Sequence, residues 1–101
     1  MEYSKLIWTH GDHDLPIEIY SEYDADGWET RKVEVFADGS FGFAGAQSCS
    51  GATRLSLIQK PADSDVTADP QFHIESCTTA EFDRVWKSAQ SRSPSRAVPA
   101  A

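Results

Sequence analysis

Residues 17–36 decide the fold of this chain, and their sequence is IEIYSEYDADGWETRKVEVF. Two runs rich in β-branched and aromatic residues flank the polar segment Ala25-Asp26-Gly27. This composition is typical of two strands joined by a tight turn. A three-residue hairpin loop with glycine in the left-handed conformation fits the segment. We therefore expect a β-hairpin centred on Asp26.

The turns predict the register of a larger meander. The first turn places Ile19 opposite Val33. Asp38-Gly39 fits a two-residue type I′ turn, which places Phe36 opposite Phe41. Both turns agree on one apolar face, made of Ile17, Ile19, Val33 and Val35. A slip of one residue would scatter that face, so we expect consecutive antiparallel strands at 16–23, 28–36 and 41–46.

The rest of the chain adds a first strand and a final helix. Residues 3–10 read as a strand, and residues 54–59 and 72–75 as short extended segments. Thr78 and Glu81 offer a capping box for a helix over residues 79–90. Behind the cap, four apolar residues recur at helical spacing: Phe82, Val85, Trp86 and Ala89. The predicted fold is α+β: an antiparallel β-meander of four or five strands with a C-terminal amphipathic helix packed on one face. We place the helix on the face of Ile19 and Val33.

Length and charge limit the function. The 101 residues suffice for one domain, expected over 1–90, and the Ser-, Pro- and Ala-rich residues 91–101 are expected to form a disordered tail. The net charge of −7 disfavours direct binding to nucleic acid or anionic membranes and favours cationic partners. There is no apolar run of ~18 residues and no signal-peptide pattern, so we expect a cytoplasmic protein. The oligomeric state stays open.

Acidic and aromatic residues concentrate in the first hairpin. No basic residue lies between Lys5 and Arg31, while seven carboxylates do. Ordinary surfaces intersperse the two signs, and a field of one sign attracts a basic protein. Aromatic rings among the acids would supply contact area. We therefore predict a partner-binding surface made of Glu18, Tyr20, Glu22, Asp24, Asp26, Trp28 and Glu34.

Catalytic and metal-binding patterns are weak. His10, Asp12 and His13 are residue types that bind zinc, but their spacing matches no specific site, and a polar turn explains them equally well. Neither Cys49 nor Cys77 has a neighbouring cation that would lower its thiol pKa. We expect two free thiols, with one disulfide left as the alternative. The prediction is a protein that is not an enzyme and holds no metal or cofactor.

Several segments resemble a family of small bacterial proteins known as a domain of unknown function. The resemblance starts from Tyr3, Lys5, Trp8 and His10 and continues through residues 16–22, 26–39, 53–55 and 81–86. It covers roughly residues 2–90 and implies no established activity. Small acidic bacterial domains of this kind also resemble immunity proteins of toxin–immunity pairs, by size and charge.

The leading functional hypothesis is therefore an acidic protein-binding inhibitor, an immunity protein that neutralises a basic, nuclease-type toxin domain by occlusion. One alternative is an inhibitor that mimics nucleic acid, which needs carboxylates spaced like phosphates. Another is a small metal-dependent hydrolase using His10, Asp12 and His13. The last alternative is a regulatory module that has no toxin partner.

Overall fold

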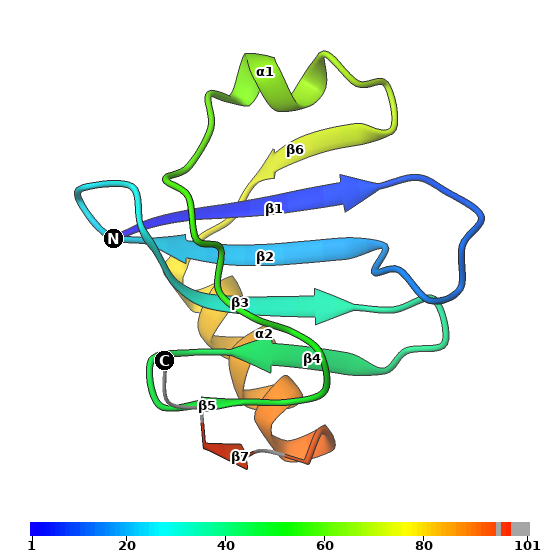
Figure 1. Ribbon diagram of the computed structural model, residues 1–101, viewed down its shortest axis with the longest axis vertical. Coiled ribbons are helices and arrows are strands. Elements are labelled where there is room, and N and C mark those ends of the chain that lie inside the picture. Colours follow the sequence, from blue (N-terminus) through cyan, green and yellow to red (C-terminus); the bar gives the residue numbers. More distant parts are fainter. Residues whose placement is uncertain (95, 98–101) are drawn as a thin grey trace.

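An antiparallel sheet forms the centre of the fold (Figure 1). The structure, a computed structural model, describes residues 1–94 and 96–97. In this part of the chain the strands are β1 (Glu2–Trp8), β2 (Glu18–Tyr23), β3 (Glu29–Val35), β4 (Phe41–Ala44), β5 (Ser48–Cys49), β6 (Phe72–Ser76) and β7 (Arg96–Ala97). They lie in the order β6-β1-β2-β3-β4-β5-β7. The two helices are α1 (Asp63–Thr67) and α2 (Thr79–Arg92). The predicted α+β class is confirmed.

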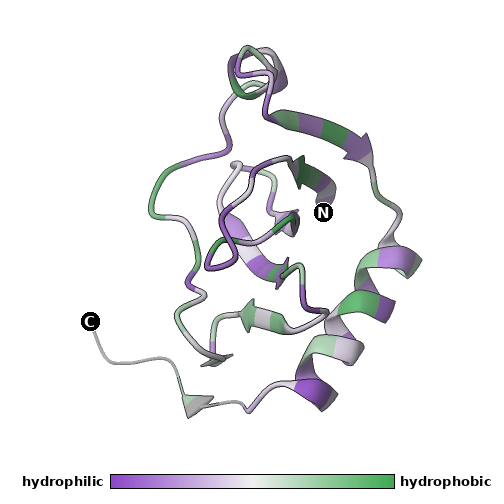
Figure 2. Ribbon diagram, turned by 90° about the vertical axis from the view of Figure 1, so that its right-hand side faces the viewer, coloured by the Kyte–Doolittle hydropathy of each residue, from purple (hydrophilic) through white to green (hydrophobic). Residues whose placement is uncertain are grey.

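The sheet lies between two unlike layers. Figure 2 shows α2 on one side of it and an irregular segment on the other. This segment, residues 50–62, is called the strap here; it joins β5 to α1 and crosses the sheet. The chain then returns through α1 to β6, which pairs with the outer side of β1. The expectation of a strand at 54–59 was wrong, because this part of the strap forms no sheet pairing.

The first turn forms as predicted. The Asp24 amide donates to the Trp28 carbonyl at 2.9 Å, and Gly27 has φ of 85°. A β-bulge next to the turn then shifts the register: Tyr23 pairs with Glu29, but Glu22 pairs with Arg31. The strands beyond the bulge are offset by one residue from the turn's own register.

The second turn differs from the prediction. Its loop has three residues, with hydrogen bonds from the Phe36 amide to the Ser40 carbonyl and from the Gly39 amide back to Phe36. Val35 therefore faces Phe41, where a two-residue turn would have paired Phe36 with Phe41. The left-handed glycine at position 39 is common to both turn types, so the dipeptide alone did not separate them.

The first offset turns β2 over relative to β3, and the second turns β4 over relative to β3. Tyr20, not Ile19, lies opposite Val33, and Phe43 follows on β4. A period of two means that a shift of one residue turns a strand over relative to its neighbour. Tyr20, Val33 and Phe43 thus share the face that α2 covers, while Ile19 faces the strap. The expected helix face was half wrong: it includes the β3 valines but not Ile19.

Helix α2 closes the core. Thr78 is its N-cap, and the Thr78 side chain accepts from the Glu81 amide at 3.1 Å, as the capping box predicted. Phe82 is fully buried against the sheet, and Trp86 makes an edge contact with Phe43 at 5.3 Å between ring centroids. Aromatic contacts of this geometry stabilise a core beyond the area they bury.

Several residues after position 90, where a disordered tail is expected, make contacts with the rest of the protein. The helix continues to Arg92, and the Ser93 hydroxyl donates to the Phe41 carbonyl at 2.8 Å. Arg96–Ala97 then pairs with Ser48–Cys49. The remaining residues of the expected tail, 95 and 98–101, lie outside the described residues.

The packing of the strap onto β4 gives a test of the fold. A Cβ at Gly42 would overlap Thr53 Oγ1, which donates to Glu34 Oε1 at 2.6 Å. We expect Gly42→Ala to destabilise the protein by about 1–3 kcal/mol in urea unfolding, because Thr53 must rotate and lose that bond.

Gly11→Ala is the control, since nothing lies within 4 Å of a Cβ there. It should stay within about 0.5 kcal/mol of the wild type. Equal stability of the two variants would show that the strap does not pack on β4 as described.

Candidate functional site

Glu22 lies inside the fold. It is 5 % exposed and accepts two hydrogen bonds from Arg31, at 2.9 and 2.6 Å. The Tyr3 hydroxyl (3.0 Å) and the Thr30 hydroxyl (2.8 Å) also donate to its carboxylate. These bonds, above all those from Arg31, hold the pKa of Glu22 at about 2, against an ordinary value of 4.5. Glu22 is therefore a structural anion, and no partner can reach it in this arrangement.

Arg31 links that anion to α2. Its guanidinium also contacts Asp83 at 3.3 Å and lies over the rings of Phe82 and Trp86, at 4.8 and 5.2 Å from their centroids. Its hydrogen bond to Glu22 raises the pKa of Arg31 above the ordinary range. The helix thus packs on a charged pair in which no buried donor or acceptor lacks a hydrogen-bond partner.

Other carboxylates of the hairpin are also engaged within the protein. Glu18 pairs with Lys5 at 3.3 Å, and Glu34 accepts from Thr53. The buried Glu29 pairs with Lys32 at 3.1 Å. The sequence therefore overstated the exposed charge: on the strands, the acids are balanced by neighbours that strand pairing and the strap bring to them.

Tyr20 belongs to the core. It is 9 % exposed, lies opposite Val33 and packs in the cluster beneath α2. The predicted surface therefore separates into two groups. The side chains of Glu18, Tyr20, Glu22 and Glu34 are occupied by contacts within the fold, whereas Asp24, Asp26 and Trp28 remain together in the β2–β3 turn.

The β2–β3 turn is held by its own hydrogen bonds and is partly exposed. One Asp24 carboxylate oxygen accepts from the amides of Asp26 (2.9 Å) and Trp28 (3.0 Å), which fixes the loop. Asp26 is exposed, and the Trp28 side chain is 45 % exposed. A fixed turn presents an aromatic ring at a low cost in conformational entropy on binding.

The strap brings two further apolar residues to this turn. Leu57 is 93 % and Ile58 66 % exposed. Hydrogen bonds on both sides hold them there: the Ser56 amide donates to Glu29 Oε1 at 2.7 Å, and the Lys60 amide to the Gly27 carbonyl at 2.8 Å. We call the combined area the turn–strap surface. It consists of Asp24, Asp26, Trp28, Leu57 and Ile58.

Leu57 and Ile58 are absent from the surface predicted from the sequence, because their segment was expected to be a strand. Their adjacency in the sequence was a signal against a one-sided strand. Neighbouring side chains of a strand point to opposite faces, so a one-sided strand cannot bury both. Residues 60–61, Lys-Pro, follow directly and disfavour a continuing strand.

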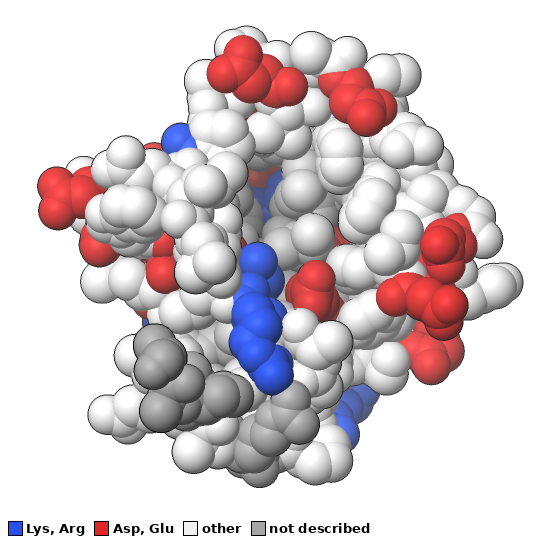
Figure 3. Space-filling model, viewed as in Figure 1, with Lys and Arg blue, Asp and Glu red and all other residues white. Residues whose placement is uncertain are grey.

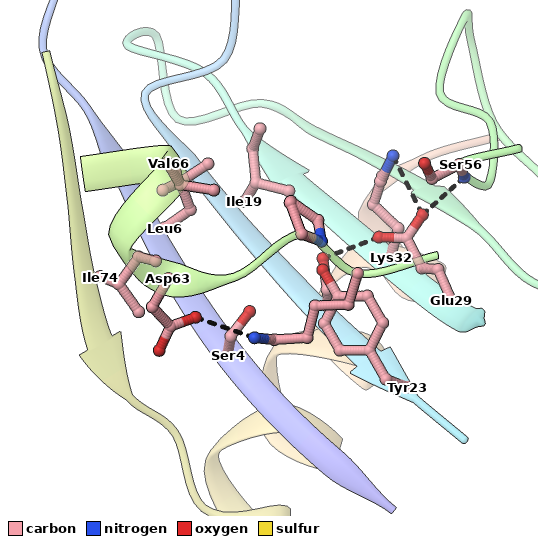
Figure 4. Close-up of a pocket in the computed structure, with 13 residues that line it drawn as sticks. Ser4, Leu6, Ile19, Tyr23, Glu29, Lys32, Ser56, Asp63, Val66 and Ile74 are labelled. Atoms are coloured by element: carbon pink, nitrogen blue, oxygen red, sulfur yellow. Dashed lines mark hydrogen bonds and ion pairs between the residues drawn. The ribbon is translucent and has the colours of Figure 1, made fainter. Parts of the chain in front are cut away.

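A hollow of about 190 Å³ opens beside the strap on the same side of the sheet. Figure 3 shows it near the middle of this view, with Asp and Glu side chains mainly around the periphery. We call it the sheet hollow. Its floor is apolar, from Leu6, Ile19 and Ile74, and Glu29 and Lys32 lie at one end (Figure 4).

The histidine cluster does not assemble a metal site. His10 Nε2 lies 2.7 Å from the Pro16 carbonyl, and His10 Nδ1 accepts from the Asp12 amide at 3.0 Å. Both ring nitrogens of His10 thus contact backbone atoms of its own loop. Within the described residues, no group of three or more His, Cys, Asp or Glu side chains is placed to hold a metal ion.

The two cysteines are separate free thiols. Cys49 is buried, and Cys77 is half-buried just before α2. Burial raises the pKa of Cys77, which makes its thiol less reactive at neutral pH. None of the described helices is long and apolar enough to cross a membrane.

The fold is that of a small α+β protein, and its turn–strap surface exposes acidic and apolar side chains. A family model described as a domain of unknown function, DUF6881, matches residues 2–91, and the chain belongs to this family. The resemblance seen in the sequence is thereby confirmed at the level of the family. Searches of curated proteins and of solved structures gave no significant match.

The Glu22–Arg31 pair gives a prediction about acid stability. Because the pKa of Glu22 is lower in the folded protein, its contribution is complete above about pH 4.5 and is lost as the pH falls towards 2. We expect Glu22→Gln to lower the free energy of unfolding at pH 7 by about 2–3 kcal/mol and to flatten its decline between pH 5 and 3. Urea unfolding at several pH values measures both effects.

Asp65→Asn removes one exposed carboxylate from α1 and serves as the control. It should keep the wild-type stability at pH 7 and the wild-type acid decline. An undiminished decline in Glu22→Gln would mean that other carboxyl groups cause the acid sensitivity.

Proposed function

We propose that this protein is an acidic protein-binding inhibitor that acts in the cytoplasm and occludes a basic partner domain. The partner class that fits best is a nuclease-type toxin, which would make the chain an immunity protein. The observation that carries the proposal is the turn–strap surface, where exposed apolar side chains lie near the turn that carries the exposed Asp26.

The apolar content of this surface supports binding to a protein. Five large hydrophobic residues of the described chain are exposed, and three of them, Trp28, Leu57 and Ile58, belong to it. Single exposed apolar residues are ordinary, but several on neighbouring segments, linked here by the Lys60–Gly27 and Gln59–Asp26 hydrogen bonds, favour an interaction site. Tryptophan is also enriched among the residues that dominate binding energy.

The charge supports a basic partner. The chain carries −7 overall, and the exposed acids near the turn–strap surface include Asp26 and, on β1, Glu2, which lies 3.8 Å from Lys60 Nζ. An excess of one sign speeds the encounter with an opposite charge over about one Debye length. Nuclease domains need basic clefts to hold phosphate, so an acidic turn with a protruding ring is suited to cover such a cleft.

The rival hypotheses have less support. A nucleic-acid mimic needs a row of free carboxylates, whereas Glu18, Glu22 and Glu34 are held by Lys5, Arg31 and Thr53. A metal-dependent hydrolase needs ring nitrogens directed at a metal, whereas those of His10 bond to its own loop.

The free thiols at Cys49 and Cys77 agree with the reducing compartment of the proposal.

The test is binding to the basic protein domain encoded by a neighbouring gene, by surface plasmon resonance at low and high salt. Asp26→Lys should slow association several-fold and reduce its salt dependence. Leu57→Asp should raise the dissociation rate at least tenfold, because it places a charge in the contact area.

Asp14→Lys is the matched control. It makes the same change in net charge on the exposed β1–β2 loop. It should leave the dissociation rate unchanged and alter association less than Asp26→Lys does. The surface is misassigned if all three variants bind alike, and the function is misassigned if no basic neighbour binds at all.

A further inference from the structure

The sheet hollow is bounded by the same segments that carry the turn–strap surface. Tyr23 and Glu29, on either side of the turn, line it, as do Ser56 and Lys60, on either side of the exposed strap residues. A protein that covers the turn–strap surface must therefore approach the mouth of the hollow.

The polar end of the hollow has no unmet demand for a charged ligand. One oxygen of Glu29 accepts from the Ser21 hydroxyl at 2.7 Å, and the other from the Ser56 amide at 2.7 Å. Lys32 Nζ contacts that second oxygen at 3.1 Å and donates to the Arg54 carbonyl at 3.0 Å. A bound ion would have to displace bonds that are already made.

The charged groups of the lining also balance. Glu29 pairs with Lys32, and Asp63 pairs with Lys60 at 2.8 Å, so two anions face two cations. This is unlike the chain as a whole, which carries −7. A lining with no net charge offers no electrostatic gain to a charged occupant, which would still lose its hydration.

Apart from serine side chains such as Ser4, the remaining surface of the hollow is mainly apolar and comes from several elements. Leu6, Ile19 and Ile74 form the floor from β1, β2 and β6, and Val66 of α1 stands over them (Figure 4). A cavity of about 150 Å³ with such a lining can hold benzene. The sheet hollow, at about 190 Å³, has room for one ring or one branched aliphatic group.

We propose that the sheet hollow receives one uncharged apolar side chain, leucine, isoleucine or phenylalanine in type, from the protein that docks on the turn–strap surface. This inference rests on the proposed function and adds an apolar anchor to it. Binding energy at interfaces concentrates where such an anchor enters a pocket, while the surrounding contacts exclude water. The acidic turn would steer the partner, and the hollow would hold it.

The first test uses blocked amino acids as probes of the full chain. N-acetyl-phenylalanine amide and N-acetyl-leucine amide should shift the NMR methyl signals of Leu6, Ile19 and Ile74, saturating near ~1 mM, as expected for ligands of this size. N-acetyl-lysine amide should cause no saturable shift. Saturation by the lysine probe, or by none of the three, would overturn the proposal.

A filled hollow provides the matched variant. Ser4 lines the hollow from β1, and Ser4→Phe would place a ring inside it. The variant should lose the probe shifts while its thermal unfolding stays cooperative. Val66→Phe fills the hollow from α1 and replaces Ser4→Phe if that variant does not fold. Undiminished probe binding in a folded variant would overturn the proposal.

A third test asks whether the hollow prefers a free small molecule to a protein side chain. Free p-cresol should bind no more tightly than the blocked amino acids; tenfold tighter binding would make the hollow a small-molecule site and overturn the inference.

A fourth test separates this inference from the proposed function. With the basic partner, Ser4→Phe should weaken affinity at least tenfold. Unchanged affinity, in a protein whose binding is still weakened by Asp26→Lys, would overturn the inference alone and leave the proposed function standing.

Discussion

The buried contact between Glu22 and Arg31 is the interaction on which the rest of the structure depends. It joins β2 to β3, accepts the Tyr3 hydroxyl from β1 and, through Asp83 and the ring of Phe82, ties α2 to the sheet. A charge pair in this position is stabilising only when both partners stay and their other hydrogen bonds are made. Because those bonds exist here, an acidic strand can lie beneath a helix without being exposed to solvent.

That contact also explains how the acidic hairpin divides. Carboxylates on the strands form ion pairs or hydrogen bonds with cations and hydroxyls that the sheet and strap bring near. Their negative charge is therefore largely balanced within the protein. Carboxylates in the turn lie beyond the last strand pair, where Asp24 organises the loop and Asp26 faces solvent. The binding surface we propose is accordingly smaller than the sequence suggested and more apolar, since Leu57 and Ile58 join it from the strap.

Local sequence signals predicted the turns and the C-terminal helix well. They did not predict the register of the strands or the sheet face that the helix covers. The Asp24–Trp28 turn, the Thr78 cap and the apolar stripe of α2 depend on residues within a few positions of each other, so the sequence was sufficient for them. The bulge at Glu22 and Tyr23 carries no comparable local mark. It is favoured because it turns Glu22 towards Arg31 and Tyr20 towards Phe43, and these gains appear only once the strands and the helix are assembled.

The sequence by itself determined that this is a small acidic α+β protein with a β-hairpin at Asp26 and a capped C-terminal helix, because composition, turn chemistry and periodicity are local properties. Only the tertiary structure decided which sheet face the helix covers, which carboxylates stay exposed and that the strap lies beside the first turn. The physical reason is that side chains alternate along a strand. One inserted residue exchanges the two faces, and the free energy that selects its position comes from packing between segments far apart in the chain.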